Sequence, residues 1–166
     1  MLWTYILSMS YATITDLEAA YSVALFGRLC VRTDDPDPVP GPTIILRQQA
    51  ALDEAAGVMD GYFQPSYSVP VMTSVPSGLS SLRGCCCVLA VAVLVGQKGY
   101  VRGSEDESLI LRAEVWRSWL RDVSAGKVQI PGASATDASN AGSAPRKDHF
   151  VMSKRHAIHD LDRRYR

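Results

Sequence analysis

The sequence lacks the short motifs that mark the common catalytic sites. It has no glycine-rich phosphate loop, no G-x-S-x-G nucleophile elbow, no H-E-x-x-H zinc motif and no paired-cysteine metal signature. Its three histidines, His149, His156 and His159, all lie near the C-terminus, where no cysteine accompanies them. His156 and His159 are spaced so that they could share a helical face, but a metal site needs more convergent ligands. We therefore predict no catalytic residue, no metal and no cofactor.

Cysteine is scarce, and its arrangement suits neither a disulfide framework nor a zinc site. Cys30 stands alone and the other three cysteines are adjacent, at residues 85–87, within an apolar run. The favoured interpretation is small buried apolar side chains in a reducing compartment. The N-terminal stretch MLWTYILSMSYA has no basic region that would make it a signal peptide. With neither an export signal nor a transmembrane span recognised, we expect the protein to be made and kept in the cytoplasm.

Long apolar runs are also absent, with one exception, around which the rest of the chain must pack. All eleven residues from 85 to 95 are apolar, within a segment spanning residues 79–96. Eleven residues form about 16 Å of helix, whereas a bilayer needs about 20 residues. The run therefore predicts a fully buried central helix. Val91, Val93 and Val95 leave a buried strand as the alternative.

Three further stretches show the apolar periodicity of amphipathic helices. The first begins with the capping-box pattern Thr15-Asp16-Leu17-Glu18. Proline-rich or glycine-bounded loops at residues 33–42, 64–78 and 99–103 separate the helices. The predicted boundaries of these three helices are Thr15 to Gly27, Thr43 to Pro65, and Ser104 to Gly126. The sequence thus predicts an all-α, four-helix domain over residues 15–130, preceded by an extended N-terminal arm at residues 1–14.

The C-terminal part differs in composition from this body. Residues 131–145 are rich in Gly, Ala and Ser and predict a flexible linker. Residues 146–166 carry a net charge of +4, against −4 for residues 1–145. This basic arm also contains apolar side chains, which suit a groove on a protein better than a phosphate backbone. The predicted docking residues are Phe150, Val151, Met152, Lys154, Arg155, Ile158, Leu161, Arg163, Arg164 and Tyr165. Binding of nucleic acid and a solubilising tail remain alternatives.

Aromatic residues make up only 8% of the chain, so each one near a helix edge is informative. Trp116 falls on the apolar stripe of its helix, whereas Trp119 falls beside the stripe. Aromatic side chains of this kind often anchor protein interfaces. Trp119, Tyr62 and Tyr67 are therefore candidate subunit-interface residues.

Several stretches resemble the small Mu-like phage head-to-tail connector proteins, in the same order and with similar spacing. Residues 10–21, SYATITDLEAAY, are similar to the opening of those proteins. Residues 51–71 resemble their long second helix and its D-G-Y-containing end, and residues 119–132 their last helix. Phe150 and the Ser153-Lys154-Arg155 tripeptide are similar to their tail ending.

Three features depart from that pattern. Ser66 stands where the resemblance leads us to expect arginine, residues 1–9 precede the family-like start, and residues 85–87 place three cysteines where one small or sulfur-containing residue is usual. None of these departures changes the expected architecture.

The resemblance implies a virion structural protein without catalysis. Such connectors form a ring, usually of twelve copies, beneath the portal of the phage head. The ring continues the channel for double-stranded DNA, without sequence specificity, and offers a surface to the next neck or tail component. The implied location is the virion neck, with no membrane partner. The alternatives are a small nucleic-acid-binding regulator that uses the basic arm, and an enzyme or enzyme accessory subunit.

Overall fold

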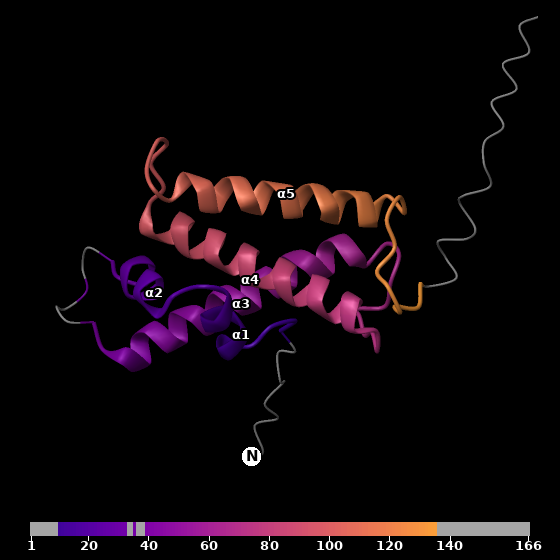
Figure 1. Cartoon of the computed structure of the whole chain (residues 1–166), viewed down its shortest axis with the longest axis horizontal. Helices are drawn as coiled ribbons and strands as arrows, with labels where there is room; N and C mark the ends of the chain where they lie inside the picture. Colours follow the sequence, from indigo (N-terminus) through magenta and orange to yellow (C-terminus); the bar gives the residue numbers. More distant parts are fainter. Residues whose placement is uncertain (1–9, 33–34, 36–38, 136–166) are drawn as a thin grey trace, which may run out of the picture.

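The computed structural model describes residues 10–32, 35 and 39–135, and these residues form an all-α fold (Figure 1). The helices of this part of the chain are α1 (Ile14–Ala20), α2 (Val23–Leu29), α3 (Gly41–Phe63), α4 (Pro76–Lys98) and α5 (Glu107–Ser124). The predicted all-α class is confirmed. The predicted number of four helices differs from the five observed in the described part, because the first predicted helix is two short ones.

The break between α1 and α2 follows from local capping. Thr13, and not Thr15, caps α1: the Asp16 amide donates to its hydroxyl at 3.2 Å, and the Asp16 carboxylate accepts from the Thr13 amide at 2.9 Å. Tyr21 then adopts an extended conformation, and the Ser22 hydroxyl caps α2 by accepting from the Leu25 amide. Because a serine cap starts a new helix, the prediction that one helix runs to Gly27 is wrong.

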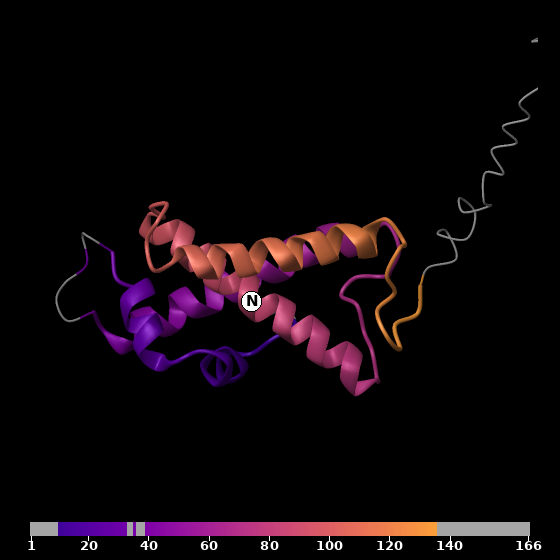
Figure 2. The same cartoon turned by 45° about the horizontal axis from the view of Figure 1, so that its top comes forward.

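Helix α4 is the centre of the fold, as its apolar run predicted. Residues 85–92 are all buried, and α4 packs against both α3 and α5 (Figures 1 and 2). The strand alternative is therefore excluded. Over its full length α4 is long and apolar enough to cross a membrane, with a mean hydropathy of 2.0 in its most apolar window. Because 67% of that window is buried inside the protein, α4 has the arrangement of a core helix.

The long helices α3 and α5 begin slightly away from their predicted starts. Helix α3 begins at Gly41, two residues before Thr43, because Pro42 is well tolerated in a first turn, where its missing N–H would have no helical partner. It ends at Phe63, before Pro65 as expected. Helix α5 begins at Glu107, three residues after Ser104, and ends at Ser124. Gly126 follows with a positive φ of 70°, which confirms its predicted role after the C-terminus of the helix.

Residues 131–135, the start of the predicted linker, pack on the body of the protein. Ala135 and Ala133 form isolated antiparallel bridges with Tyr67 and Thr73 in the connection between α3 and α4. The Thr73 hydroxyl also donates to the Pro131 carbonyl at 2.6 Å. These five residues therefore belong structurally to the domain. The remainder of the linker and the docking arm at residues 146–166 lie outside the described residues, as do residues 1–9 of the N-terminal arm.

Candidate functional site

The described part of the chain offers no cluster of three His, Cys, Asp or Glu side chains that could hold a metal ion. The three histidines singled out in the sequence lie outside that part. The ten predicted docking residues of the C-terminal arm also lie outside it, so the structure neither places them nor brings them together.

The cysteines lie in the core, where their chemistry is suppressed. All four are buried and form no disulfide. Burial raises the pKa of the Cys87 thiol to about 12, and it also raises the pKa values of Cys30, Cys85 and Cys86. The thiolate is the nucleophilic form, so these side chains are packing groups at neutral pH.

The three aromatic residues predicted for a subunit interface occupy different environments. Tyr67 is only 4% exposed, and its hydroxyl accepts a hydrogen bond from the Ile130 amide at 3.1 Å. Tyr67 therefore joins the connection between α3 and α4 to the segment that follows α5, and it presents almost no surface to a partner. Tyr62 and Trp119 are half-buried at the edge of the core, where Trp119 packs edge-on against Phe63. Only these two keep some surface for another subunit.

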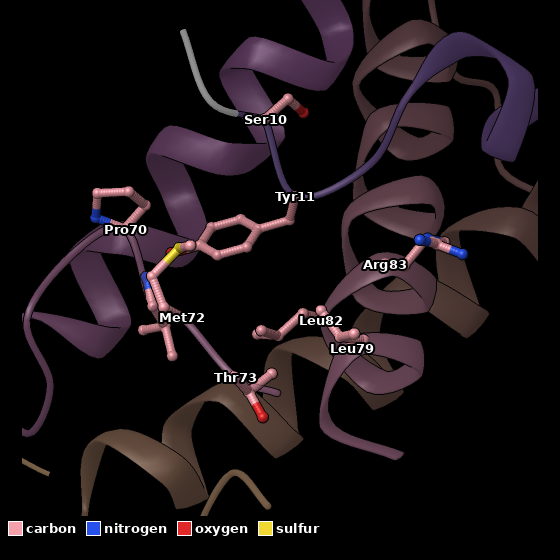
Figure 3. Close-up of a pocket in the computed structure, with 9 residues that line it drawn as sticks. Ser10, Tyr11, Pro70, Met72, Thr73, Leu79, Leu82 and Arg83 are labelled. Atoms are coloured by element: carbon pink, nitrogen blue, oxygen red, sulfur yellow. The ribbon is translucent and has the colours of Figure 1, made fainter. Parts of the chain in front are cut away.

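The described residues contain an apolar groove beside the first half of α4, which we call the Tyr11 groove (Figure 3). Its volume is about 160 Å³, far more than a single water molecule requires. The side chains of Tyr11 and Met72 lie on one side of it, opposite Leu79 and Leu82 of α4 (Figure 3). The full lining is Ser10, Tyr11, Pro70, Val71, Met72, Thr73, Leu79, Leu82 and Arg83.

A hydrogen-bonded network fixes the Tyr11 side of this groove. The Tyr11 hydroxyl donates to the Asp60 carboxylate of α3 and accepts from the Val71 amide at 2.9 Å. Burial and the Asp60 carboxylate both raise the pKa of Tyr11, so its hydroxyl keeps its proton. The hydroxyl of Ser10, the residue before Tyr11, donates to the Leu52 carbonyl at 3.4 Å. Three segments distant in sequence are thereby held in one surface.

The polar groups at the rim of the groove are already paired. The Arg83 guanidinium forms an ion pair with Asp16 at 3.2 Å, and the Thr73 hydroxyl is engaged by Pro131. Two lining side chains are instead apolar and open to solvent: Met72 is 69% exposed and Leu79 is 45% exposed. The groove therefore suits an apolar side chain.

A second hollow lies on the other side of Arg83 and is more polar. Its volume is about 180 Å³, and Asp16, Tyr21, Arg83 and Arg112 are among its lining residues. The Arg112 guanidinium lies over the Tyr21 ring, 5.7 Å from its centroid. The charged groups of this hollow thus contact each other or an aromatic face, which gives it less capacity for a further partner than the Tyr11 groove.

Sequence reasoning did not predict the Tyr11 groove. The sequence of residues 64–78 indicates only a connection, and nothing local indicates that Met72 and Leu79 remain exposed next to Tyr11. One signal was present: Tyr11 and Asp60 both belong to the stretches that resemble the phage connectors. The structure brings these two residues into direct contact.

The fold and its surface define a small all-α protein whose described part is built around a buried helix and carries an open apolar groove. Comparison with protein families identifies the family to which the chain belongs. The family described as Bacteriophage Mu, Gp36 matches residues 11–147, which is most of the chain. The chain therefore belongs to the bacteriophage Mu Gp36 family, and the predicted resemblance to Mu-like phage proteins is confirmed. No curated protein matches the sequence.

The limits of the family match are informative. It begins at Tyr11, so the nine residues that we expected to precede the family-like start do lie outside it. It includes Tyr11, Asp60 and the whole connection between α3 and α4, and hence every lining residue of the Tyr11 groove except Ser10.

Proposed function

We propose that this protein is a structural component of the phage neck. Copies of the chain form a ring, with twelve as the expected number, that joins the portal of the head to the next neck or tail component. The ring continues the channel through which double-stranded DNA passes without sequence-specific contacts. The protein acts in the virion, is assembled in the host cytoplasm, and performs no catalysis. Membership of a bacteriophage Mu family supports a phage role.

The distribution of exposed apolar side chains carries the proposal of a ring. Leu111 and Val115, 60% and 69% exposed, lie on the outer face of α5. The Tyr11 groove is a separate apolar surface, because none of its lining residues belongs to α5. A ring is built from heterologous contacts, in which one face of each copy meets a different face of the next. Two separate apolar surfaces on one subunit fit that requirement.

The C-terminal arm supplies the contact that completes assembly in this proposal. Its cations and apolar side chains, at residues 146–166, dock on the portal or on a neighbouring subunit. The tether raises the effective concentration of the arm at its site, so that a small domain gains affinity without a larger interface.

Mass photometry of the protein, alone and with a portal protein, tests the function. We expect a ring-sized species on the portal with the full chain and none after deletion of residues 146–166. Circular dichroism should show the same helical content for the α1–α5 body in both. Normal assembly of the shortened chain would contradict the role of the arm. Failure of the full chain to assemble or to bind the portal would contradict the neck function.

The basic arm also favours a second candidate, a nucleic-acid-binding regulator. That function predicts a mobility shift of short DNA duplexes that weakens steeply with salt, because phosphate contacts release counterions. A shift that requires residues 146–166 and forms in the absence of any ring would bring this candidate forward.

A further inference from the structure

The Tyr11 groove is an apolar surface that the described chain leaves uncovered. Met72 and Leu79 are exposed beside it, while Arg83 and Thr73 at its rim each have a partner within the subunit. The Tyr11 hydroxyl already donates to Asp60 and accepts from Val71. An occupant would therefore gain by burying apolar side chains and would find few free hydrogen-bonding groups.

Residues 1–9 have the composition that such a groove would accept. Their sequence, MLWTYILSM, contains no charged residue, and most of its side chains are apolar or aromatic. They join the described chain at Ser10, which itself lines the groove. By contrast, residues 146–166 carry seven Lys or Arg side chains, and the groove has no unpaired acidic group to receive them.

The geometry at Ser10 disfavours insertion into the groove of the same copy. The Ser10 hydroxyl is bonded to α3 through the Leu52 carbonyl, and Tyr11 forms one side of the groove (Figure 3). Because Ser10 and Tyr11 themselves line the groove, residues 1–9 would enter the groove of their own copy only by folding back over these two residues. Residues 1–12 contain no Gly, Pro, Asn or Asp, the residues that most readily form tight turns.

The length of the segment suits a neighbouring copy instead. Nine residues reach at most about 30 Å when extended. The 23 residues of α3 span about 35 Å, so this reach is comparable to the length of the subunit body. We infer that residues 1–9 of each copy insert apolar side chains into the Tyr11 groove of the adjacent copy. This inference rests on the proposed ring and names one of its subunit contacts.

Photocrosslinking between two distinguishable copies tests the contact. One copy carries Trp3→p-benzoylphenylalanine, and the other is an affinity-tagged full chain without the photoreactive residue. Both are mixed before assembly, with portal protein present, and then irradiated. We expect a product that contains both copies, with the crosslink between residues 70 and 83 of the tagged copy.

Substitutions in the tagged copy locate the acceptor. Met72→Lys with Leu79→Lys should lower the yield of crosslink at least fivefold. Leu46→Lys is the matched control, because Leu46 is an exposed apolar residue on α3 that does not line the groove. It should leave the yield unchanged. Circular dichroism of each variant establishes that the acceptor is folded before its yield is compared.

The outcomes separate this inference from the proposed function. Ring formation, measured by mass photometry on the same samples, reports on the function. Rings in which Trp3 crosslinks only within its own copy, or away from residues 70–83, would overturn the inference and leave the ring intact. Occupation of the groove by residues 146–166 would overturn it as well. Absence of rings from the full chain would overturn both.

Discussion

The Tyr11 hydroxyl can be removed with little change to packing, which makes Tyr11→Phe a direct test of the network that holds the groove together. The hydroxyl makes two hydrogen bonds, one to the Asp60 carboxylate and one from the Val71 amide. The Tyr11 ring packs edge-on against Phe63, with centroids 6.0 Å apart, and phenylalanine would keep that contact. The substitution therefore isolates the two hydrogen bonds.

The expected cost follows from the kind of each bond. A neutral hydrogen bond contributes about 0.5–1.5 kcal/mol to stability, and one to a charged group contributes about 1.5–3 kcal/mol. Tyr11 is only half-buried, so water from the groove can reach Asp60 and Val71 and recover part of that loss. We expect Tyr11→Phe to lower the free energy of unfolding by about 2 kcal/mol. With a urea m-value of about 2 kcal/mol/M, the midpoint would fall by about 1 M.

Equilibrium urea unfolding, followed by far-UV circular dichroism at one fixed protein concentration, measures this change. Tyr62→Phe is the control, since Tyr62 is also half-buried but its hydroxyl makes no hydrogen bond within the described residues. It should shift the midpoint by less than about 0.2 M. Equal and small effects of the two substitutions would refute the claim that the Tyr11 hydroxyl joins the N-terminal segment, α3 and the connection to α4.

Three further predictions concern two glycines of α4, the contact between Asp35 and Arg47, and the buried cysteines. A Cβ at Gly78 would collide with the Pro131 carbonyl, whereas a Cβ at Gly84 would meet only Trp116, at 3.6 Å. Thermal unfolding should therefore show that Gly78→Ala destabilises the protein by about 2 kcal/mol. The same measurement should show that Gly84→Ala stabilises it by about 0.5 kcal/mol. The Arg47 guanidinium bonds Asp35 and lowers the pKa of that carboxyl to about 2. Since the unfolded state takes up the proton first, Asp35 should stabilise the protein above about pH 4 and lose that contribution as the pH falls toward 2, so that Asp35→Asn flattens the acid limb of a stability–pH profile. The four buried thiols, including Cys87, should remain unmodified by iodoacetamide at pH 8 in mass spectrometry and become fully alkylated in guanidinium.

Each of these three predictions has an outcome that would contradict it. Equal effects of alanine at the two α4 glycines would mean that residues 131–135 do not press on the start of that helix. An unchanged acid limb in Asp35→Asn would mean that the Arg47 contact does not stabilise the folded state. Rapid alkylation of native protein would mean that the core around residues 85–87 opens readily.

Features decided by neighbours in sequence were predictable. The uninterrupted apolar run of α4, the prolines around α3 and Gly126 after α5 each act within a few residues, and all three helices were expected close to their observed positions. The division between α1 and α2 is local too, but the periodicity predicts one continuous helix, whereas Ser22 is a cap. A serine within an amphipathic pattern can serve in either way, and the burial of both Leu17 and Phe26 favours the break.

The groove could not be predicted because its walls come from segments far apart in sequence. Ser10 and Tyr11 meet residues 70–73 and the first turns of α4 only after α3 and α4 have packed together. The same applies to residues 131–135, whose composition is that of a linker but whose bridges to Tyr67 and Thr73 depend on tertiary structure. The composition of residues 131–135 indicates only how that segment behaves in isolation, whereas its observed position depends on partners elsewhere in the chain.

The position of the Tyr11 network explains why recognisable residues and uncovered surface occur together. Tyr11 and Asp60 come from two of the stretches that resemble phage connectors, and both lie within the matched family region. Their contact ties Val71, and with it the connection to α4, against α3, and thereby shapes one side of a groove. Residues 1–9 lie outside the match. If they fill the groove of a neighbour, the receiving surface belongs to the family scaffold while the inserted segment belongs to this chain. Changes in residues 1–9 could then tune the strength of subunit association without disturbing the helices that form the groove.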